Sequence, residues 1–236
     1  MDFTLPFKRW GRFLADLFFP PLCLGCQAML ESPTALPLVC PNCLNSLTPL
    51  PEDFPQIHIL NRLHPCYLDD LWIAFEFSEV IRALLHSIKY QKMPRQGMRV
   101  GGYAGHILST QLQSAGEALV LPVPLHPLRA KEREYNQSAL IARGIFENLE
   151  NEIVENLLVR RRYTSSQTRL NRMRRKLNVK NAFAVGEEIP LADRAVILVD
   201  DVVTTGATLN ECARVLKERG AKRVTGMALA TPVHGE

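Results

Sequence analysis

The segment that most constrains the fold runs from Val196 to Thr208 and reads VILVDDVVTTGAT. Its first four residues are apolar, which predicts a strand that is buried on both faces of a sheet. A short polar loop follows, and the pattern over 207–219 predicts a helix that Gly220 ends. A buried strand that leads through a tight loop into a helix is the repeating unit of α/β proteins with a parallel sheet.

The loop in this segment has the composition of an anion site. Gly206 allows the backbone to approach a phosphate, and the amides from Thr205 to Leu209 point toward it with the helix dipole behind them. The residues around this glycine add hydroxyl donors or helix amides: Thr204, Thr205, Ala207 and Thr208. The carboxylates of Asp200 and Asp201 suit the hydroxyls of a ribose, directly or through hydrated Mg2+. A plain turn capped by aspartates would not need three hydroxyls around a glycine, and the G-K-[ST] of a Walker loop is missing.

The chain after residue 70 alternates between strand and helix patterns. Strands are predicted over 71–77, 118–123, 157–159, 195–199 and 223–230. Helices are predicted over 79–90, 99–112, 136–149 and 207–219. This alternation predicts an α/β fold with a mainly parallel sheet and helices on both of its faces.

The first 70 residues differ in kind, because they carry ten of the 16 prolines and five of the six cysteines. Two C-x2-C pairs are separated by 13 residues: Cys23, Cys26, Cys40 and Cys43. Each pair can form a knuckle with two thiolates, and two knuckles complete a closed, structural zinc site. Disulfides or two redox motifs are the alternative, which a reducing compartment disfavours. We therefore predict a small zinc-binding module over 1–70 and a second domain over 71–236.

The net charge of +4 is concentrated in one segment. Nine basic and no acidic residues lie between Arg160 and Lys180, and the rest of the chain has 19 basic against 24 acidic residues. The partner of this segment is then a phosphate ligand or a polyanion. Single-stranded DNA is one such polyanion, with Tyr163 available to stack on a base. The third interpretation is a solvated helix, although such helices usually interleave acidic residues.

The sequence has no run of about 18 apolar residues, which predicts a protein without a membrane span. The apolar stretch over 17–22 is short and interrupted by prolines, unlike the core of an export signal. We therefore expect a cytoplasmic protein in a reducing compartment, where paired cysteines are more often metal ligands than disulfides.

The segment over 196–208 resembles the phosphoribosyl pyrophosphate (PRPP) signature of type I phosphoribosyltransferases. A wider set of motifs resembles the ComF competence-protein family, in which a cysteine-rich zinc module precedes a phosphoribosyltransferase domain. These motifs are LFFPPLC at 17–23, the two cysteine pairs, IKY at 88–90, PVPL at 122–125, REYNQ at 133–137 and the arginine-rich segment. The family usually has glycine and phenylalanine where this chain has Glu134 and Tyr135, and many members carry a further cysteine pair where only Cys66 remains.

The resemblance implies a sheet of the type I phosphoribosyltransferase kind and Mg2+ with PRPP as the ligand. It implies that Asp200 and Asp201 act in catalysis together with arginines of a mobile loop that closes over PRPP: Arg162, Arg174 and Arg175. It implies that further residues bind the ligand: Lys89, Pro124, Leu125, Arg129, Arg133, Asn136, Gln137, Thr164 and Gln167. His126 lies in the loop that would hold pyrophosphate, where a lone histidine is more often a solvated bystander.

Two functions from different classes fit these residues. One is phosphoribosyl transfer, in which a nucleophile attacks the anomeric carbon of PRPP and pyrophosphate leaves under the basic loop. The other is a non-catalytic accessory of DNA uptake, in which the PRPP fold is a sensor or scaffold. In that case the basic segment binds single-stranded DNA or another DNA-uptake protein. The resemblance implies a part in natural transformation for either.

Overall fold

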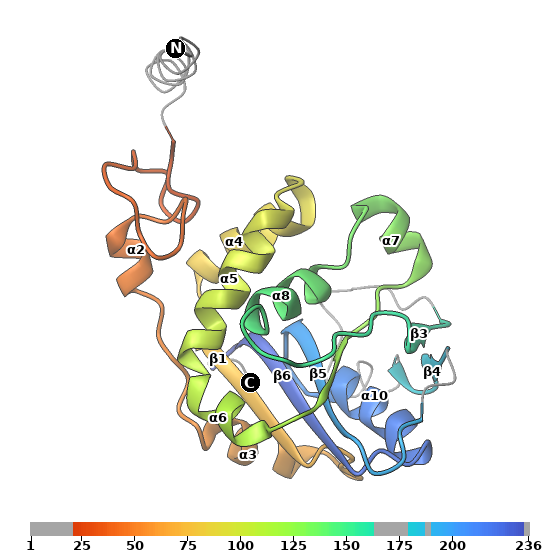
Figure 1. Ribbon diagram of the computed structural model, residues 1–236. Coiled ribbons are helices and arrows are strands. Elements are labelled where there is room, and N and C mark those ends of the chain that lie inside the picture. Colours follow the sequence, from red (N-terminus) through yellow and green to blue (C-terminus); the bar gives the residue numbers. More distant parts are fainter. Residues whose placement is uncertain (1–20, 163–178, 187–189, 234–236) are drawn as a thin grey trace, which may run out of the picture.

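The computed structural model describes residues 21–162, 179–186 and 190–233. Its centre is a sheet of four parallel strands in the order β1-β6-β5-β2 (Figure 1). The strands are β1 (Asp70–Glu76), β2 (Leu119–Pro122), β5 (Ala195–Val202) and β6 (Arg223–Thr231). Most of their residues are buried, as in sheets that are covered on both faces. The predicted α/β fold with a mainly parallel sheet is confirmed.

Helices cover both faces of this sheet. On one face lie α4 (Glu79–Tyr90), α5 (Pro94–Ile107) and α8 (Gln137–Ile145), whose apolar side chains share one core with the sheet. On the other face lies α10 (Ala207–Glu218), together with apolar residues from 50–68. Because β2 and β5 pair in parallel, their carboxyl ends meet at the same edge of the sheet. The predicted phosphate loop begins at that edge.

Both predicted ends of the helix over 99–112 are wrong. α5 begins at Pro94 and ends at Ile107, and a separate short helix, α6 (Ser109–Ala115), follows Leu108. Proline suits the first turn of a helix, since the N–H that it lacks has no partner inside the helix there. By contrast, the bounds predicted for α4 agree with the structure, where the Ser78 side chain accepts the N–H of Ile81 as an N-cap.

α5 and α8 pack against each other with their backbones in close contact. A Cβ atom on Gly101 of α5 would collide with the backbone oxygen of Ile141 in α8. A Cβ atom on Gly144 of α8 would collide in the same way with the backbone oxygen of Met98. Small residues at the crossing therefore fix how near α8 lies to α5, and through α8 they position the residues at its N-terminus.

Three short elements flank the carboxyl end of the sheet. α7 (Pro127–Arg133) follows the loop after β2, while β3 (Leu158–Arg160) and β4 (Phe183–Val185) form an antiparallel pair. The sequence predicted β3 within one residue, but it predicted neither α7 nor β4. Both missed elements are short, so their apolar periodicity is weak. Most of the basic segment, residues 163–178, lies outside the described residues.

The region before β1 packs closely on the rest of the chain. Figure 1 shows the part around α2 (Pro41–Asn45), in red and orange, beside α4 and α5. Farther along, the N–H of Leu50 donates to Ala74 O at 3.0 Å, and the N–H of Glu76 donates to Thr48 O at 2.9 Å. Both apolar cores include residues from before and after residue 70. The division of the chain at that residue stays a prediction.

Among the described residues, no helix combines the length and the apolar character that crossing a membrane requires.

Candidate functional site

The loop after β5 encloses a small hollow of about 40 Å3 at the carboxyl end of the strand. It is lined by Asp200 and residues 202–209, which include the predicted phosphate ligands Thr204, Thr205, Gly206, Ala207 and Thr208. Gly206 has a φ of +72°, a left-handed conformation that glycine adopts without strain, and α10 begins at the next residue. Backbone amides at the start of a helix, next to hydroxyl groups, are suited to a phosphate.

The segment before β1 supports this loop from behind. A Cβ atom on Gly206 would lie 2.8 Å from Cγ2 of Ile59, so the loop backbone rests directly on that side chain. One turn farther into α10, the buried Asn210 accepts the N–H of Tyr67 at 2.7 Å and donates to Pro65 O at 2.9 Å. Sequence reasoning missed this support. Asn210 could have indicated it, because it is a polar residue on the otherwise apolar face of the helix.

The two aspartates at the end of β5 are held by hydrogen bonds and by a lysine. Asp200 accepts the hydroxyl of Ser138 at 3.2 Å and the N–H of Asp201 at 2.8 Å. Asp201 forms an ion pair with Lys89, which stands near the end of α4. Burial, followed by the negative charge of Asp201, raises the pKa of Asp200 to about 7. The pair therefore carries a charge that its surroundings disfavour, and a ligand that donates hydrogen bonds or brings a cation would stabilise it.

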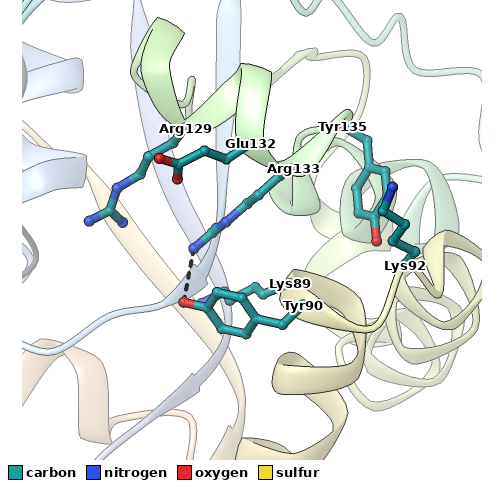
Figure 2. Close-up of a pocket in the computed structure, with 7 residues that line it drawn as sticks. All are labelled: Lys89, Tyr90, Lys92, Arg129, Glu132, Arg133 and Tyr135. Atoms are coloured by element: carbon teal, nitrogen blue, oxygen red, sulfur yellow. Dashed lines mark hydrogen bonds between the residues drawn. The ribbon is translucent and has the colours of Figure 1, made fainter.

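Lys89 of this ion pair also lines a second hollow, of about 260 Å3. Seven residues line it and are drawn in Figure 2: Lys89, Tyr90, Lys92, Arg129, Glu132, Arg133 and Tyr135. We call it the basic pocket, because four of these residues are cations and one is an acid. Arg133 places its guanidinium 5.3 Å from the centre of the Tyr90 ring. Three predicted ligand residues, Lys89, Arg129 and Arg133, are thus brought together.

Asn136 and Gln137 position neighbouring groups and line neither hollow. Asn136 caps α8 by accepting the N–H of Ser138 at 3.1 Å, and it donates to Val123 O at 3.0 Å. The side chain of Gln137 accepts a hydrogen bond from Arg133 at 3.0 Å. The cap holds the start of α8 against the loop after β2, which directs the Ser138 hydroxyl to Asp200.

The loop after β2 lies against the end of β5, where the N–H of Val123 donates to Val199 O at 2.8 Å. Pro124 is buried and Leu125 is half-buried, and neither belongs to the lining of the two hollows. His126 accepts the N–H of Leu128 at 3.3 Å through Nδ1 and so caps α7. This loop leads directly into α7, whose Arg129 and Arg133 line the basic pocket.

The departures from the family pattern at Glu134 and Tyr135 have a structural explanation. Glu134 ends α7 with a φ of +65°, the left-handed region in which glycine is at ease. In this chain the glutamate side chain forms an ion pair with Lys92 at 2.6 Å. Tyr135 donates its hydroxyl to Ile88 O at 2.5 Å, which joins the segment after α7 to the end of α4.

β3 brings an arginine that sequence reasoning did not single out. The guanidinium of Arg160 lies 5.3 Å from the centre of the Phe183 ring, across the β3–β4 pair. Burial lowers the pKa of Arg160, while the charge of Asp200 acts in the opposite direction. Arg162 instead donates to Lys180 O at 2.9 Å, at the base of the basic segment. The other predicted residues of this segment lie outside the described residues: Thr164, Gln167, Arg174 and Arg175.

The four cysteines of the two C-x2-C pairs converge near the start of α4. Their Sγ atoms all lie within 4.8 Å of one another, and those of Cys26 and Cys40 are 3.7 Å apart. Four thiolates around one tetrahedral zinc ion would be separated by about 3.8 Å, from zinc–sulfur bonds of about 2.3 Å. A Cβ atom on Gly25 would lie 2.9 Å from Sγ of Cys43, so this position accommodates only glycine without displacement. The cluster fits one metal ion.

The backbone around the cluster favours thiolates in part. Burial raises the pKa of Cys23, but backbone N–H groups, above all that of Cys40 at 3.2 Å, outweigh it and lower the pKa to about 6. For Cys43, burial and the neighbouring thiols both raise the pKa. Cys23 is thus a thiolate at neutral pH, whereas the Cys43 thiol resists ionisation beside it. A bound cation would stabilise the negative charge on both sulfur atoms.

Comparisons with known proteins agree with this architecture. The phosphoribosyl transferase domain family matches residues 107–236. Competence protein F of Haemophilus influenzae is 31% identical over 217 residues, which cover 89% of this chain and 90% of that protein. DNA utilization protein YhgH of Salmonella typhi is 28% identical over 228 residues, or 93% and 90% of the two chains. Competence protein ComFC of Streptococcus pneumoniae is 33% identical over 127 residues, or 52% of each.

The match to the phosphoribosyl transferase domain family covers β2, β5 and β6, the loop after β5 and the carboxylate pair, so this part of the chain has a phosphoribosyltransferase fold. The similarity to Competence protein F extends over most of the chain, and the described residues include the four-cysteine cluster. The chain therefore belongs to the ComF competence-protein family, within the phosphoribosyl transferase domain family.

Proposed function

We propose that this chain binds Mg-PRPP across both hollows and transfers its phosphoribosyl group. The 5-phosphate would occupy the loop over 204–208, the ribose hydroxyls would face Asp200 and Asp201, and the pyrophosphate would enter the basic pocket. The observation that carries this proposal is the ion pair between Lys89 and Asp201, which joins the carboxylates to a pocket with four cations. PRPP has the same order of groups, with hydroxyls between a phosphate and a pyrophosphate.

The residues suggest a mechanism that relies on electrostatics. The acceptor forms a bond to the anomeric carbon as the bond from that carbon to the pyrophosphate oxygen breaks, and pyrophosphate takes the electron pair. Arg129, Arg133 and Lys89 would stabilise the charge that gathers on the leaving group. The carboxylates would hold the ribose and stabilise positive charge on its ring. Mg2+, when bound with PRPP, would neutralise part of the pyrophosphate charge.

The proposal includes structural zinc in the four-cysteine cluster and a cytoplasmic location. Four cysteine ligands leave no open position on the metal, so the ion would hold the fold and take no part in the reaction. A reducing compartment would favour paired cysteines as metal ligands over disulfides.

Titration of the zinc-loaded full chain with PRPP and Mg2+ in a calorimeter tests the ligand. The double change Asp200→Asn and Asp201→Asn should weaken binding about a hundredfold or more, since it removes two charged hydrogen-bond acceptors. Asp193→Asn is the matched control, because Asp193 precedes the opposite end of β5. Equal affinity in the double variant and the wild type would refute the site. Release of pyrophosphate from bound PRPP, screened against acceptors, then tests transfer itself.

A second function is favoured by the relatives and by the charge of the basic segment. Two of the relatives are competence proteins and a third is a DNA utilization protein, which supports a part in natural transformation or DNA use. The basic segment would bind single-stranded DNA or another DNA-uptake protein. Binding of a fluorescent oligonucleotide should then fall steeply with salt and should weaken when Arg174 and Arg175 become glutamine. A flat dependence on salt would exclude phosphate contacts by this segment.

A further inference from the structure

Lys92 lines the basic pocket, but its charge is turned toward a carboxylate. Its Nζ atom lies 2.6 Å from Oε1 of Glu134, at the end of α7. Figure 2 shows Lys92 beside Tyr135, with Arg129 on the opposite side of the pocket. Lys92 thus contributes to the pocket wall, while its ammonium group has a partner of opposite charge.

The position of Glu134 makes this carboxylate unusual. Its φ of +65° is left-handed, as is the φ of +53° at Lys92, and side chains at such positions cost conformational energy that glycine avoids. The backbone N–H of Glu134 already completes the end of α7 by donating to Ala130 O at 3.0 Å. A glycine would adopt this left-handed conformation at lower energy. The contribution specific to the glutamate side chain is therefore its ion pair with Lys92.

The cations of the pocket differ in what they contact. Lys89 pairs with Asp201, and Lys92 pairs with Glu134. Within the described structure, the contacts of Arg133 are instead neutral, with Tyr90 and Gln137. The ion pair of Lys92 is also exposed, with 71% and 60% of the two side chains accessible, so its strength is modest and a ligand can compete with it.

We propose that Glu134 sets the affinity of the basic pocket for pyrophosphate, by engaging the Lys92 ammonium group that would otherwise face the ligand. The inference rests on the proposed function, in which this pocket receives the pyrophosphate of PRPP. A limit on affinity has a use in a transferase, because a product that is held too tightly leaves slowly. Glu134 is therefore a residue that tunes the ligand affinity through Lys92, without contact to the reacting atoms.

Calorimetric titration of the zinc-loaded full chain with inorganic pyrophosphate and Mg2+, at low salt, tests this inference. Glu134→Gln should bind pyrophosphate about two- to fivefold more tightly, the range expected for one exposed ion pair. Lys92→Met should lower the affinity by less than about twofold in the wild-type background. In the double variant the gain from Glu134→Gln should vanish, because the released charge is missing.

Glu132→Gln is the matched control, since Glu132 lines the same pocket and the same charge is removed. Any gain from that change should persist when Lys92 is methionine. Glu134→Gly provides a second variant that suits the left-handed conformation, and it should show the same gain as Glu134→Gln. Unchanged or weaker binding by both Glu134 variants would overturn the inference, and so would a gain that survives Lys92→Met.

The pocket assignment itself is tested by Arg133→Met in the same experiment. If Arg133→Met weakens pyrophosphate binding and the Glu134 variants do not change it, the inference fails while the proposed pocket stands. If the wild type and all variants bind no pyrophosphate, or if Arg133→Met binds as the wild type does, the proposed pocket fails and the inference fails with it.

Discussion

The four-cysteine cluster and the carboxylate pair at the end of β5 both gather acidic groups, but the pKa values of Cys23 and Asp200 are shifted in opposite directions. At the cluster, backbone N–H donors outweigh burial and lower the pKa of Cys23 to about 6. At the end of β5, burial and the charge of Asp201 outweigh the nearby donors and raise the pKa of Asp200 to about 7. The first region favours one thiolate, that of Cys23, while the Cys43 thiol resists ionisation, and the second region holds a charge that a ligand would stabilise.

The surroundings explain this difference. Cys23 and Cys40 belong to the apolar core that includes α4 and β1, so a metal ion there would become part of the packing. Asp200 instead lines the hollow of the loop after β5, and Asp201 contacts Lys89, which lines the basic pocket. A permanent cation suits the first setting, and a ligand that arrives and leaves suits the second.

The largest effect is expected from losing the metal of the cluster. Cys40→Ser removes one thiolate, and metal binding of this kind can supply most of the stability of a small module. We expect the melting midpoint to fall by on the order of 10 °C or more, measured by circular dichroism together with the metal content. Cys66→Ser is the control, because Cys66 is exposed and outside the cluster. Equal melting of the two variants would show that the cluster contributes no stability.

Hydrogen exchange on the same variant shows how far the disturbance spreads. The Gly25 position lies against the side chain of Val80, at the start of α4. Amides of α4 should therefore lose protection together with those of 21–47, while amides of α10 on the opposite face should keep it. Loss of protection confined to the region before residue 70 would support the predicted division of the chain there.

A smaller effect, of opposite sign, is expected at the carboxylate pair. The pKa of Asp200 is about 7 in the folded chain against an ordinary value of 3.8, so folding takes up a proton between these values. The stability gained from this proton is fully present below about pH 4 and is lost as the pH rises through 7. Asp200→Asn stays neutral and should be more stable than the wild type at pH 8, by about 1–3 kcal/mol.

Urea unfolding at pH 5 and pH 8 measures this effect. The advantage of Asp200→Asn over the wild type should be larger at pH 8 than at pH 5. Asp193→Asn, at the other end of β5, should follow the pH dependence of the wild type. If the stability of Asp200→Asn changes with pH as the wild type does, another group is responsible and the raised pKa of Asp200 is wrong.

The elements with strong patterns were predictable from the sequence. The stripe of apolar residues in α4 and the continuous apolar run of β5 gave elements that the structure confirms. The loop over 204–208 was locatable because its residues are consecutive, so local geometry brings them together, and phosphate binding there stays a prediction. The cysteine cluster was predictable for a related reason, since two knuckles leave few ways to arrange four thiols.

Features that depend on distant parts of the chain were not predictable. The ion pair of Lys89 with Asp201 joins residues from two elements, and no local pattern connects them. Arg160 stacks on Phe183 because β3 pairs with β4, and the sequence did not predict β4. The same holds for Glu134, whose left-handed backbone and contact with Lys92 only the folded chain brings together.

The smallest effect is expected from one hydrogen bond at the carboxylate pair, between Ser138 and Asp200. Ser138 donates its hydroxyl to Asp200 at 3.2 Å, and this bond opposes the rise in the pKa of Asp200. Ser138→Ala removes the donor, so the pKa of Asp200 should rise further. The fall in stability with pH should then be centred at a higher pH, as measured by urea unfolding at closely spaced pH values. Ser87→Ala is the control, because that buried serine donates to Leu84 O in α4 and has no contact with the carboxylates. A shift in both variants would point to a general loss of packing, whereas a shift in Ser138→Ala alone would show that donors from α8 determine how readily this site carries its charge.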